Sequence, residues 1–307
     1  MKIVNLNSRS VTIELESNTP YYNEKEYDII LNGNFLRKEK RNVFTIYDLK
    51  PDEEYTLKAQ EEISFITPKE PWTIYLKDFN PYADGVNNDT AFIQAAIMAT
   101  PFGGTLIIED GTYLVTSLYL KSNINLYLKK GAKILASTQR RDYPIHPSYA
   151  NIGLWEGAEV NNFASTLNFV DSENITVYGE GEIDGQAENG DWYINHRQMN
   201  IAWRGHSIFM VRSSNISIIG LYVHNTQAWA IHPYMSSHLN FYNLELKNNP
   251  KMPTTDGIDP DCSSNIEIKG CKFSVGDDCI AIKSGTYDLA LKYKKASSDI
   301  LIENNLM

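Results

Sequence analysis

Three aspartates near the end of the sequence carry its strongest chemical signal. Asp256 lies in Thr-Thr-Asp-Gly-Ile-Asp-Pro-Asp, and Asp277 and Asp278 lie in Gly-Asp-Asp-Cys-Ile-Ala-Ile-Lys-Ser-Gly. Carboxylates held close together repel, so at least one of the three should have a raised pKa. Cleavage of a glycosidic bond needs a protonated carboxyl, which donates to the leaving oxygen, beside an ionised one, which activates water. These three aspartates are therefore the candidate catalytic residues.

The same segments have less specific interpretations. An Asp-Asp pair is commonly a solvated turn, and the segment that contains Asp256 is rich in the oxygen ligands that calcium prefers. This segment lacks the twelve-residue spacing and the distal glutamate of an EF-hand loop. The sequence therefore predicts no metal site.

A recurrent pattern predicts how the aspartates come together. Ser-x-Asn-Ile, or a close variant, recurs at intervals of 23 to 51 residues, with anchors at Asn123, Asn174, Asn215, His238, Asn265 and Asp299. The shorter intervals fit one turn of a parallel β-helix, whose turns bury their apolar sides only against one another. Asparagines aligned in this way are expected to stack as a hydrogen-bonded ladder.

The spacing of the aspartates matches that repeat. Asp256 and Asp277 are 21 residues apart, close to one turn, and neighbouring turns lie about 4.8 Å apart. Asp256 should therefore lie almost over Asp277 and Asp278 on one outer strip. Counting from Asn215 places residues 227–232 beside this strip.

Candidate substrate-binding residues follow from this placement. Trp229 offers an aromatic face that suits a pyranose ring, His232 lies on the same segment, and Lys283 is on the strand that leaves the Asp-Asp pair. Each has a structural alternative, namely loop packing for Trp229 and His232 and a solvated strand end for Lys283. Arg204 and His206 are weaker candidates.

The chain divides into two parts at a proline-marked linker. Short alternating strands fill the first part, where a Leu-x-Pro turn before Tyr55 resembles the tyrosine corner of fibronectin type III domains. One amphipathic helix over residues 89–98 opens the second part, and short strands follow it. We expect an all-β protein, with a small fibronectin type III-like β-sandwich over residues 1–68 and a right-handed parallel β-helix over residues 72–307, capped by the helix.

Composition excludes several classes of protein. Lysine and arginine number 28 against 38 aspartates and glutamates, a net charge of −10, which argues against nucleic-acid binding. The sequence has neither the apolar stretch of a membrane span nor the basic and apolar regions of a signal peptide. Its three cysteines are expected to be reduced. We expect a cytoplasmic protein, with secretion as the alternative if a leader lies outside the sequence; the oligomeric state is left open.

Taken together, these segments resemble glycoside hydrolase family 28, the polygalacturonases. The resemblance covers about residues 72–307 and includes Gly-Glu-Ile-Asp-Gly-Gln and Trp-Ala-Ile-His-Pro. It implies hydrolysis of α-1,4-galacturonosyl bonds in polygalacturonate or oligogalacturonides, with inversion and without a cofactor. It assigns Asp277 as the general acid, and Asp256 and Asp278 as the residues that position and deprotonate water. Inversion calls for a gap of about 6.5–9.5 Å between acid and base carboxyls.

The sequence departs from the family pattern in two ways. Thr254 stands where the family usually has asparagine, and the Gly-His-Gly and Arg-x-Lys motifs are missing. The repeat predicts the next contribution to the site about four residues beyond Met307, so we expect a domain that is incomplete at its C-terminus. Three alternatives remain, namely a non-catalytic pectin-binding remnant, a calcium-dependent polysaccharide lyase and a fragment that does not fold.

Overall fold

The N-terminal part forms two antiparallel sheets around a shared core. The computed structural model describes residues 1–150, 152–286 and 288–307. One sheet has the order β1-β2-β5 and the other β4-β3-β6-β7. Their strands are β1 (Lys2–Leu6), β2 (Val11–Glu14), β3 (Tyr22–Leu31), β4 (Asn34–Arg41), β5 (Val43–Ile46), β6 (Glu54–Lys58) and β7 (Glu62–Ile66). Apolar residues of both sheets, including Ile13, Phe44 and Leu57, pack into one buried cluster.

A single hydrogen bond supports the predicted tyrosine corner. Tyr55 Oη accepts a hydrogen bond from the backbone N–H of Lys50 at 2.8 Å. Tyrosine corners make this kind of bond to backbone a few residues upstream. The two sheets form a small β-sandwich. Its assignment as a fibronectin type III domain stays a prediction.

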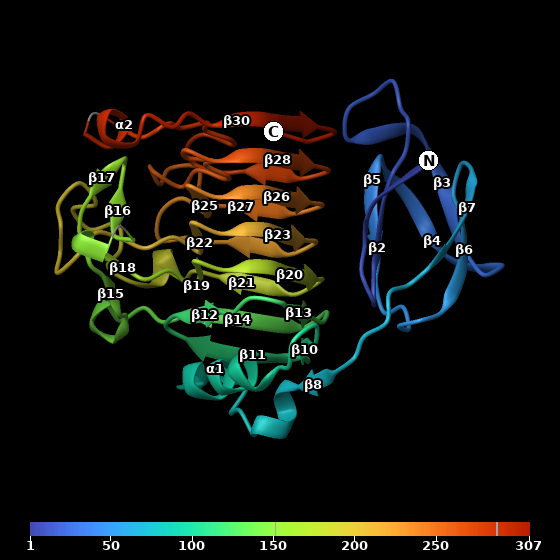
Figure 1. The fold of residues 1–307 in the computed structure, drawn as a ribbon, viewed down its shortest axis with the longest axis horizontal. Coiled ribbons are helices and arrows are strands. Elements are labelled where there is room, and N and C mark those ends of the chain that lie inside the picture. The colour runs from blue at the N-terminus through green and yellow to red at the C-terminus, as the bar shows by residue number, and fades with distance from the viewer. Residues whose placement is uncertain (151, 287) are drawn as a thin grey trace.

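The rest of the chain winds into stacked parallel sheets (Figure 1). The first is β8 (Thr73–Tyr75), β10 (Thr105–Ile108), β13 (Ile124–Leu128), β20 (Glu173–Gly179), β23 (Ser214–Ile219), β26 (Ser237–Tyr242), β28 (Ser264–Lys269) and β30 (Ser298–Glu303). The second is β9 (Asp84–Asn88), β11 (Gly111–Val115), β14 (Ala132–Ala136), β21 (Glu182–Asp184), β24 (Tyr222–His224), β27 (Glu245–Lys247) and β29 (Lys272–Ser274). The third is β12 (Leu118–Leu120), β19 (Leu167–Val170), β22 (Ile208–Val211) and β25 (Ile231–Tyr234). Consecutive strands such as β20, β21 and β22 belong to different sheets, so the chain passes from one sheet to the next as it coils, as predicted for a parallel β-helix.

The recurrent sequence pattern sets the register of this coil. Ile124, Ile175, Ile216, Leu239 and Ile266 pair with one another in succession and are at most 1 % exposed. They form one column of the apolar core. The isoleucine of each repeat therefore faces inward because burial of its side chain stabilises the stacked turns.

The asparagine of each repeat occupies a left-handed turn. Asn174 Nδ2 donates to Asn123 Oδ1 at 2.8 Å, and Asn215 Nδ2 donates to Asn174 Oδ1 at 2.6 Å, which confirms the predicted ladder for these three. Positive φ values between 54° and 63° recur at Asn123, Asn174, Asn215, His238, Asn265 and Asp299. Asparagine, aspartate and histidine are enriched in this conformation, which explains why the repeat uses them.

A short helix covers the first turn of the coil, as predicted. Helix α1 (Thr90–Ala99) buries Ile93 and Ile97. Its N-cap, Asp89, does not cap the helix with its side chain; instead its carboxylate accepts the backbone N–H groups of Tyr82 and Ala83 at 2.7 and 3.0 Å. No helix in the described ranges is long and apolar enough to span a membrane.

The longest intervals of the repeat hold loops on one side of the coil (Figure 1). The loop before β19 contains two short antiparallel strand pairs, β15–β18 and, between them in sequence, β16–β17, and the segment before β30 contains the short helix α2. The remaining short elements are η1 (Leu76–Phe79), η2 (Arg140–Asp142), β15 (Ile145–His146), η3 (Ser148–Ala150), β16 (Leu154–Trp155), β17 (Ala158–Glu159), β18 (Asn162–Phe163), η4 (Ala187–Asn189) and α2 (Asp288–Tyr293).

The N-terminal sandwich packs along the opposite side of the coil (Figure 1). Lys269 of β28 is 1 % exposed, and its Nζ lies 3.0 Å from Glu14 Oε2 of β2 and 3.2 Å from Glu303 Oε2 of β30. Arg41 of β4 donates to Asn243 at 2.9 Å. Ionic and polar contacts therefore join the two parts, in addition to the linker.

Candidate active site

The three candidate aspartates meet on one face of the last turns of the coil. One carboxylate oxygen each from Asp256, Asp277 and Asp278 lies within 4.8 Å of the others. The segments that carry them run parallel, because Ile258 and Ile280 form a bridge and the N–H of Gly257 donates to the backbone oxygen of Asp278 at 2.9 Å. We call these three aspartates the acidic strip. Their predicted proximity is confirmed.

The members of the acidic strip differ in burial. Asp256 is 4 % exposed, whereas Asp277 and Asp278 are exposed. Burial is the largest cause that raises the pKa of Asp256, to about 6; the charge of Lys283 opposes the rise, and the two neighbouring aspartates add to it. A raised pKa in the cluster was predicted, but loss of water contributes more to it than repulsion does.

Backbone amides fix both oxygens of Asp277. Its Oδ2 accepts the N–H of Thr254 at 2.8 Å, and its Oδ1 accepts the N–H of Asp278 at 3.1 Å. Amides aimed at a carboxylate stabilise the negative charge that it gains on giving up a proton. The two amides therefore fix the orientation of the Asp277 carboxylate and stabilise its ionised form.

Lys283 is enclosed rather than solvated. Its Nζ lies 4.3 Å from the centre of the Trp229 ring, 3.7 Å from Asp256 Oδ2 and 3.5 Å from Asp259 Oδ2. Asp259 is 0 % exposed, and within the described residues neither of its oxygens has a hydrogen-bond partner. Burial raises the pKa of Asp259 well above its ordinary value. These contacts disfavour the alternative of a solvated strand end for Lys283. Asp259 is a neighbour of the site that the sequence reasoning missed.

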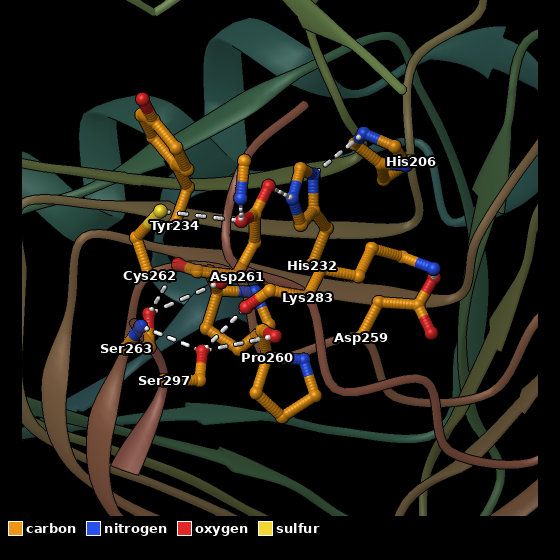
Figure 2. A network of polar contacts seen from close by, with 12 residues as sticks. His206, His232, Tyr234, Asp259, Pro260, Asp261, Cys262, Ser263, Lys283 and Ser297 are labelled. Carbon is orange, nitrogen blue, oxygen red and sulfur yellow. Dashed lines mark hydrogen bonds and ion pairs between the residues drawn. The ribbon is translucent and has the colours of Figure 1, made fainter. Parts of the chain in front are cut away.

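Figure 2 shows a buried chain of polar groups that runs from Asp261 through His232 to His206. His232 Nε2 lies 3.6 Å from Asp261 Oδ2, and His232 Nδ1 lies 3.1 Å from His206 Nε2. Asp261 Oδ1 also accepts the N–H of Gly285 at 2.8 Å. Burial favours a higher pKa for Asp261, but the neighbouring ring of His232 and the hydrogen bond from the Gly285 amide hold this pKa below its ordinary value.

The position of His232 bears on its predicted role. The side chain is 1 % exposed and packs against the rings of Trp229 and His206, at 4.9 and 4.7 Å between ring centres. His232 therefore lies behind the surface that a ligand could reach, next to Asp261. Direct contact of His232 with a sugar stays a prediction, and this burial disfavours it.

A pocket of about 510 Å³ opens over the acidic strip. Four of the predicted site residues line it, namely Trp229, Asp256, Asp277 and Lys283. The turn Glu156–Gly157, between β16 and β17, forms part of its wall and packs against Thr286. Sequence reasoning missed this turn, because it comes from a loop without a repeat pattern.

Among the residues that the structure describes, two groups of side chains have the composition of a cation site. The first is the acidic strip. The second is Glu182, Asp184 and His224, but the Nζ of Lys133 lies 2.9 Å from Glu182 and 2.8 Å from Asp184, so an ammonium group already neutralises these carboxylates. Exposed carboxylates commonly cluster without a metal, so neither group by itself indicates one.

Comparison with known proteins identifies the class to which this fold and site belong. The sequence model of a family described as "Glycosyl hydrolases family 28" matches residues 149–298. A probable polygalacturonase of Vitis vinifera is 27% identical over 234 residues, which is 74% of this chain and 47% of that protein. An exo-poly-alpha-D-galacturonosidase of Dickeya chrysanthemi is 31% identical over 132 residues, 40% of this chain and 21% of that protein. Residues 149–298 therefore match glycoside hydrolase family 28, and the resemblance that the motifs predicted is confirmed.

Solved structures support the fold over nearly the whole chain. A family 28 exopolygalacturonase of Yersinia enterocolitica matches with a TM-score of 0.74 and 21% identity, covering 99% of this chain and 67% of that one. A hyperthermoactive exopolygalacturonase of Thermotoga maritima matches with a TM-score of 0.67 and 25% identity, covering 76% and 61%. The Yersinia match takes in the N-terminal sheets as well as the coil. The chain spans about half the length of the first curated relatives that it matches.

Proposed function

We propose that this chain carries the reacting carboxylates of a hydrolase that cleaves α-1,4-galacturonosyl bonds in polygalacturonate or oligogalacturonides. The observation that carries the proposal is the acidic strip, in which three carboxylate oxygens lie within 4.8 Å of one another beside an open pocket. The names of the relatives from Vitis vinifera and Dickeya chrysanthemi support galacturonan as the substrate.

The roles within the strip follow the family pattern. Asp277 donates a proton to the leaving oxygen, and the amides of Thr254 and Asp278 stabilise the carboxylate that remains. Asp256 and Asp278 orient and deprotonate the attacking water. Since the pKa of Asp256 is about 6, its ionised form increases as the pH rises through this value. Trp229 and Lys283 line the pocket that receives the sugar, with Lys283 supplying positive charge near the substrate.

Inversion of the anomeric carbon is the proposed stereochemical outcome. It rests on the family resemblance, because the nearest oxygens of the strip are closer than the gap of about 6.5–9.5 Å expected of an inverting pair. NMR of the first anomer released tests it. Accumulation of the retained anomer would overturn inversion while leaving hydrolysis in place.

The first test is release of reducing ends from polygalacturonate with EDTA present. The wild-type chain is compared with Asp277→Asn and with the control Asp110→Asn, which removes an exposed carboxylate elsewhere. Loss of release in Asp277→Asn alone supports a hydrolase in which Asp277 takes part. Release that requires calcium and yields an unsaturated product would instead indicate a lyase. Binding without release, unchanged by Asp277→Asn, would indicate a pectin-binding remnant.

The other proposals concern organisation and location. Residues 1–68 and 72–307 are proposed as separate domains, the first a fibronectin type III-like sandwich with a structural role. The strand order of the two sheets and the bond between Tyr55 and Lys50 support this assignment. A cytoplasmic location and the absence of nucleic-acid and membrane partners stay predictions from the sequence.

A further inference from the structure

Thr254 adopts a backbone conformation that its side chain disfavours. Its φ is 59°, in the left-handed region. A β-branched residue with positive φ is an outlier, because its Cβ substituents crowd the following backbone. Such strain persists only where the surroundings hold the residue in place, and it gathers at functional sites.

Arg204 holds Thr254 in this conformation through a hydrogen bond. Its Nη2 donates to Thr254 Oγ1 at 2.8 Å, and its Nη1 donates to the backbone oxygen of Gln227 at 2.8 Å. The guanidinium carbon lies 4.9 Å from the ring centres of both Trp155 and Tyr193, and Arg204 is 2 % exposed. Its planar group is thus locked in one orientation, which a lysine could not reproduce.

The hydroxyl of Thr254 is fixed from both sides. It accepts the hydrogen bond from Arg204 and donates to the backbone oxygen of Pro253 at 2.5 Å. The side chain is therefore tied to its own backbone and to a buried cation. In this position the N–H of Thr254 points at Asp277 Oδ2, 2.8 Å away.

We propose that Arg204 is a positioning residue, which holds Thr254 in the left-handed conformation so that the Thr254 amide fixes the carboxylate of Asp277. The importance of Asp277 rests on the proposed function, whereas the hold on Thr254 does not. Arg204 acts through Thr254 and does not touch the substrate, because Trp155 and Tyr193 enclose it. No ion pair of Arg204 with a carboxylate is found in the described part of the chain, so its contacts serve hydrogen bonding and stacking.

Three substitutions of Thr254 separate the hydroxyl from the backbone. Thr254→Val keeps the shape and removes the hydroxyl, Thr254→Ser keeps the hydroxyl, and Thr254→Gly removes the hydroxyl but adopts positive φ without strain. We expect kcat on polygalacturonate to fall at least about tenfold in Thr254→Val, with KM within about twofold, because a small displacement of a reacting group is costly. Thr254→Ser and Thr254→Gly should both keep a higher kcat than Thr254→Val, because serine keeps the hydroxyl and glycine needs no support for positive φ.

Arg204→Lys completes the test. In the wild-type background it should resemble Thr254→Val, since the planar fork is lost. In the Thr254→Gly background it should change kcat less than about threefold, because glycine needs no support for positive φ. If Thr254→Gly is as slow as Thr254→Val, the hydroxyl acts directly. If Thr254→Val is as fast as Thr254→Ser, the hydroxyl has no role. Either result overturns the proposal.

A crystal structure of each variant gives a readout that does not depend on activity. The proposal expects the amide of residue 254 to leave Asp277 in Thr254→Val and to keep its hydrogen bond in Thr254→Gly. An unchanged backbone in Thr254→Val would overturn the proposal. If the wild-type chain released no sugar, the proposed function would fail, and these structures would still decide whether Arg204 holds Thr254.

Discussion

Replacing Asp256 by asparagine should stabilise the protein, and the gain should grow with pH. The pKa of Asp256 is raised to about 6 from an ordinary value of 3.8, mainly by burial. A carboxyl with a raised pKa stabilises the folded state fully below its unfolded pKa and loses this contribution as the pH rises through the folded pKa. Asparagine is neutral at every pH, so Asp256→Asn avoids the cost of ionising a buried group.

The size of the effect follows from the shift. About two pKa units, at 1.36 kcal/mol each, correspond to about 3 kcal/mol. Because the pocket is open to water, we discount this value to about 2 kcal/mol. The charge of Lys283 already lowers the pKa of Asp256, and Lys283 keeps Asp259 as a partner in the variant. At about 2 kcal/mol the melting temperature should rise by roughly 4 °C.

The assay is thermal unfolding of the wild type and Asp256→Asn between about pH 4 and pH 8, with Asp110→Asn as the control. The difference in melting temperature should be close to zero at the acidic end and reach its full size above pH 7. The control should stay within about 0.5 kcal/mol of the wild type at each pH. A variant that is less stable than the wild type at pH 8, or a difference independent of pH, would refute the reasoning.

Three further substitutions test the fold. Lys269→Met should cost about 2 kcal/mol in urea unfolding and speed proteolysis of the linker between the two parts, because it removes a buried cation and leaves the partly buried carboxylate of Glu14 without it. Lys272→Met, at an exposed ion pair, should cost less than about 0.5 kcal/mol, and equal costs would contradict this account. Gly157→Ala should lower the melting temperature more than Gly33→Ala. Both glycines have φ near 78°, but only at Gly157 would an added Cβ collide with a neighbour, Thr286. Equal losses of stability in the two variants would mean that backbone strain, and not the collision, destabilises Gly157→Ala. Tyr55→Phe should cost about 1 kcal/mol of unfolding free energy through the lost backbone hydrogen bond, and no measurable loss would argue against a tyrosine corner.

The coil and the acidic strip could be predicted because their signals are local and repeated. An asparagine such as Asn174 marks the left-handed turn, and the isoleucine after it faces the core, so the pattern reports backbone geometry and burial together. One repeat length between Asp256 and Asp277 then placed their carboxylates side by side. Counting along the repeat also placed Trp229 at the correct level.

The parts that could not be predicted depend on contacts between distant segments. Counting along the repeat predicted which turn of the coil carries His232. It did not predict that the His232 ring is buried next to Asp261. The turn Glu156–Gly157 reaches the pocket from a loop without periodicity, and its hairpin is held by a residue more than a hundred positions away. The contact between Lys269 and Glu14 likewise joins residues 255 positions apart, and no local pattern records it.

The bridge between Ile258 and Ile280 means that the backbone of the coil sets the distance between the candidate catalytic carboxylates. Because Asp256 and Asp277 project from adjacent turns, the spacing of hydrogen-bonded strands, about 4.8 Å, sets the distance between them. Repacking of the core cannot change this distance without breaking the ladder itself. Loops such as the one that carries Glu156 can lengthen or shorten between turns without changing the distance between Asp256 and Asp277. Reshaping of the pocket wall can therefore proceed independently of the spacing of the carboxylates, and heat should abolish that spacing only when the turns themselves separate.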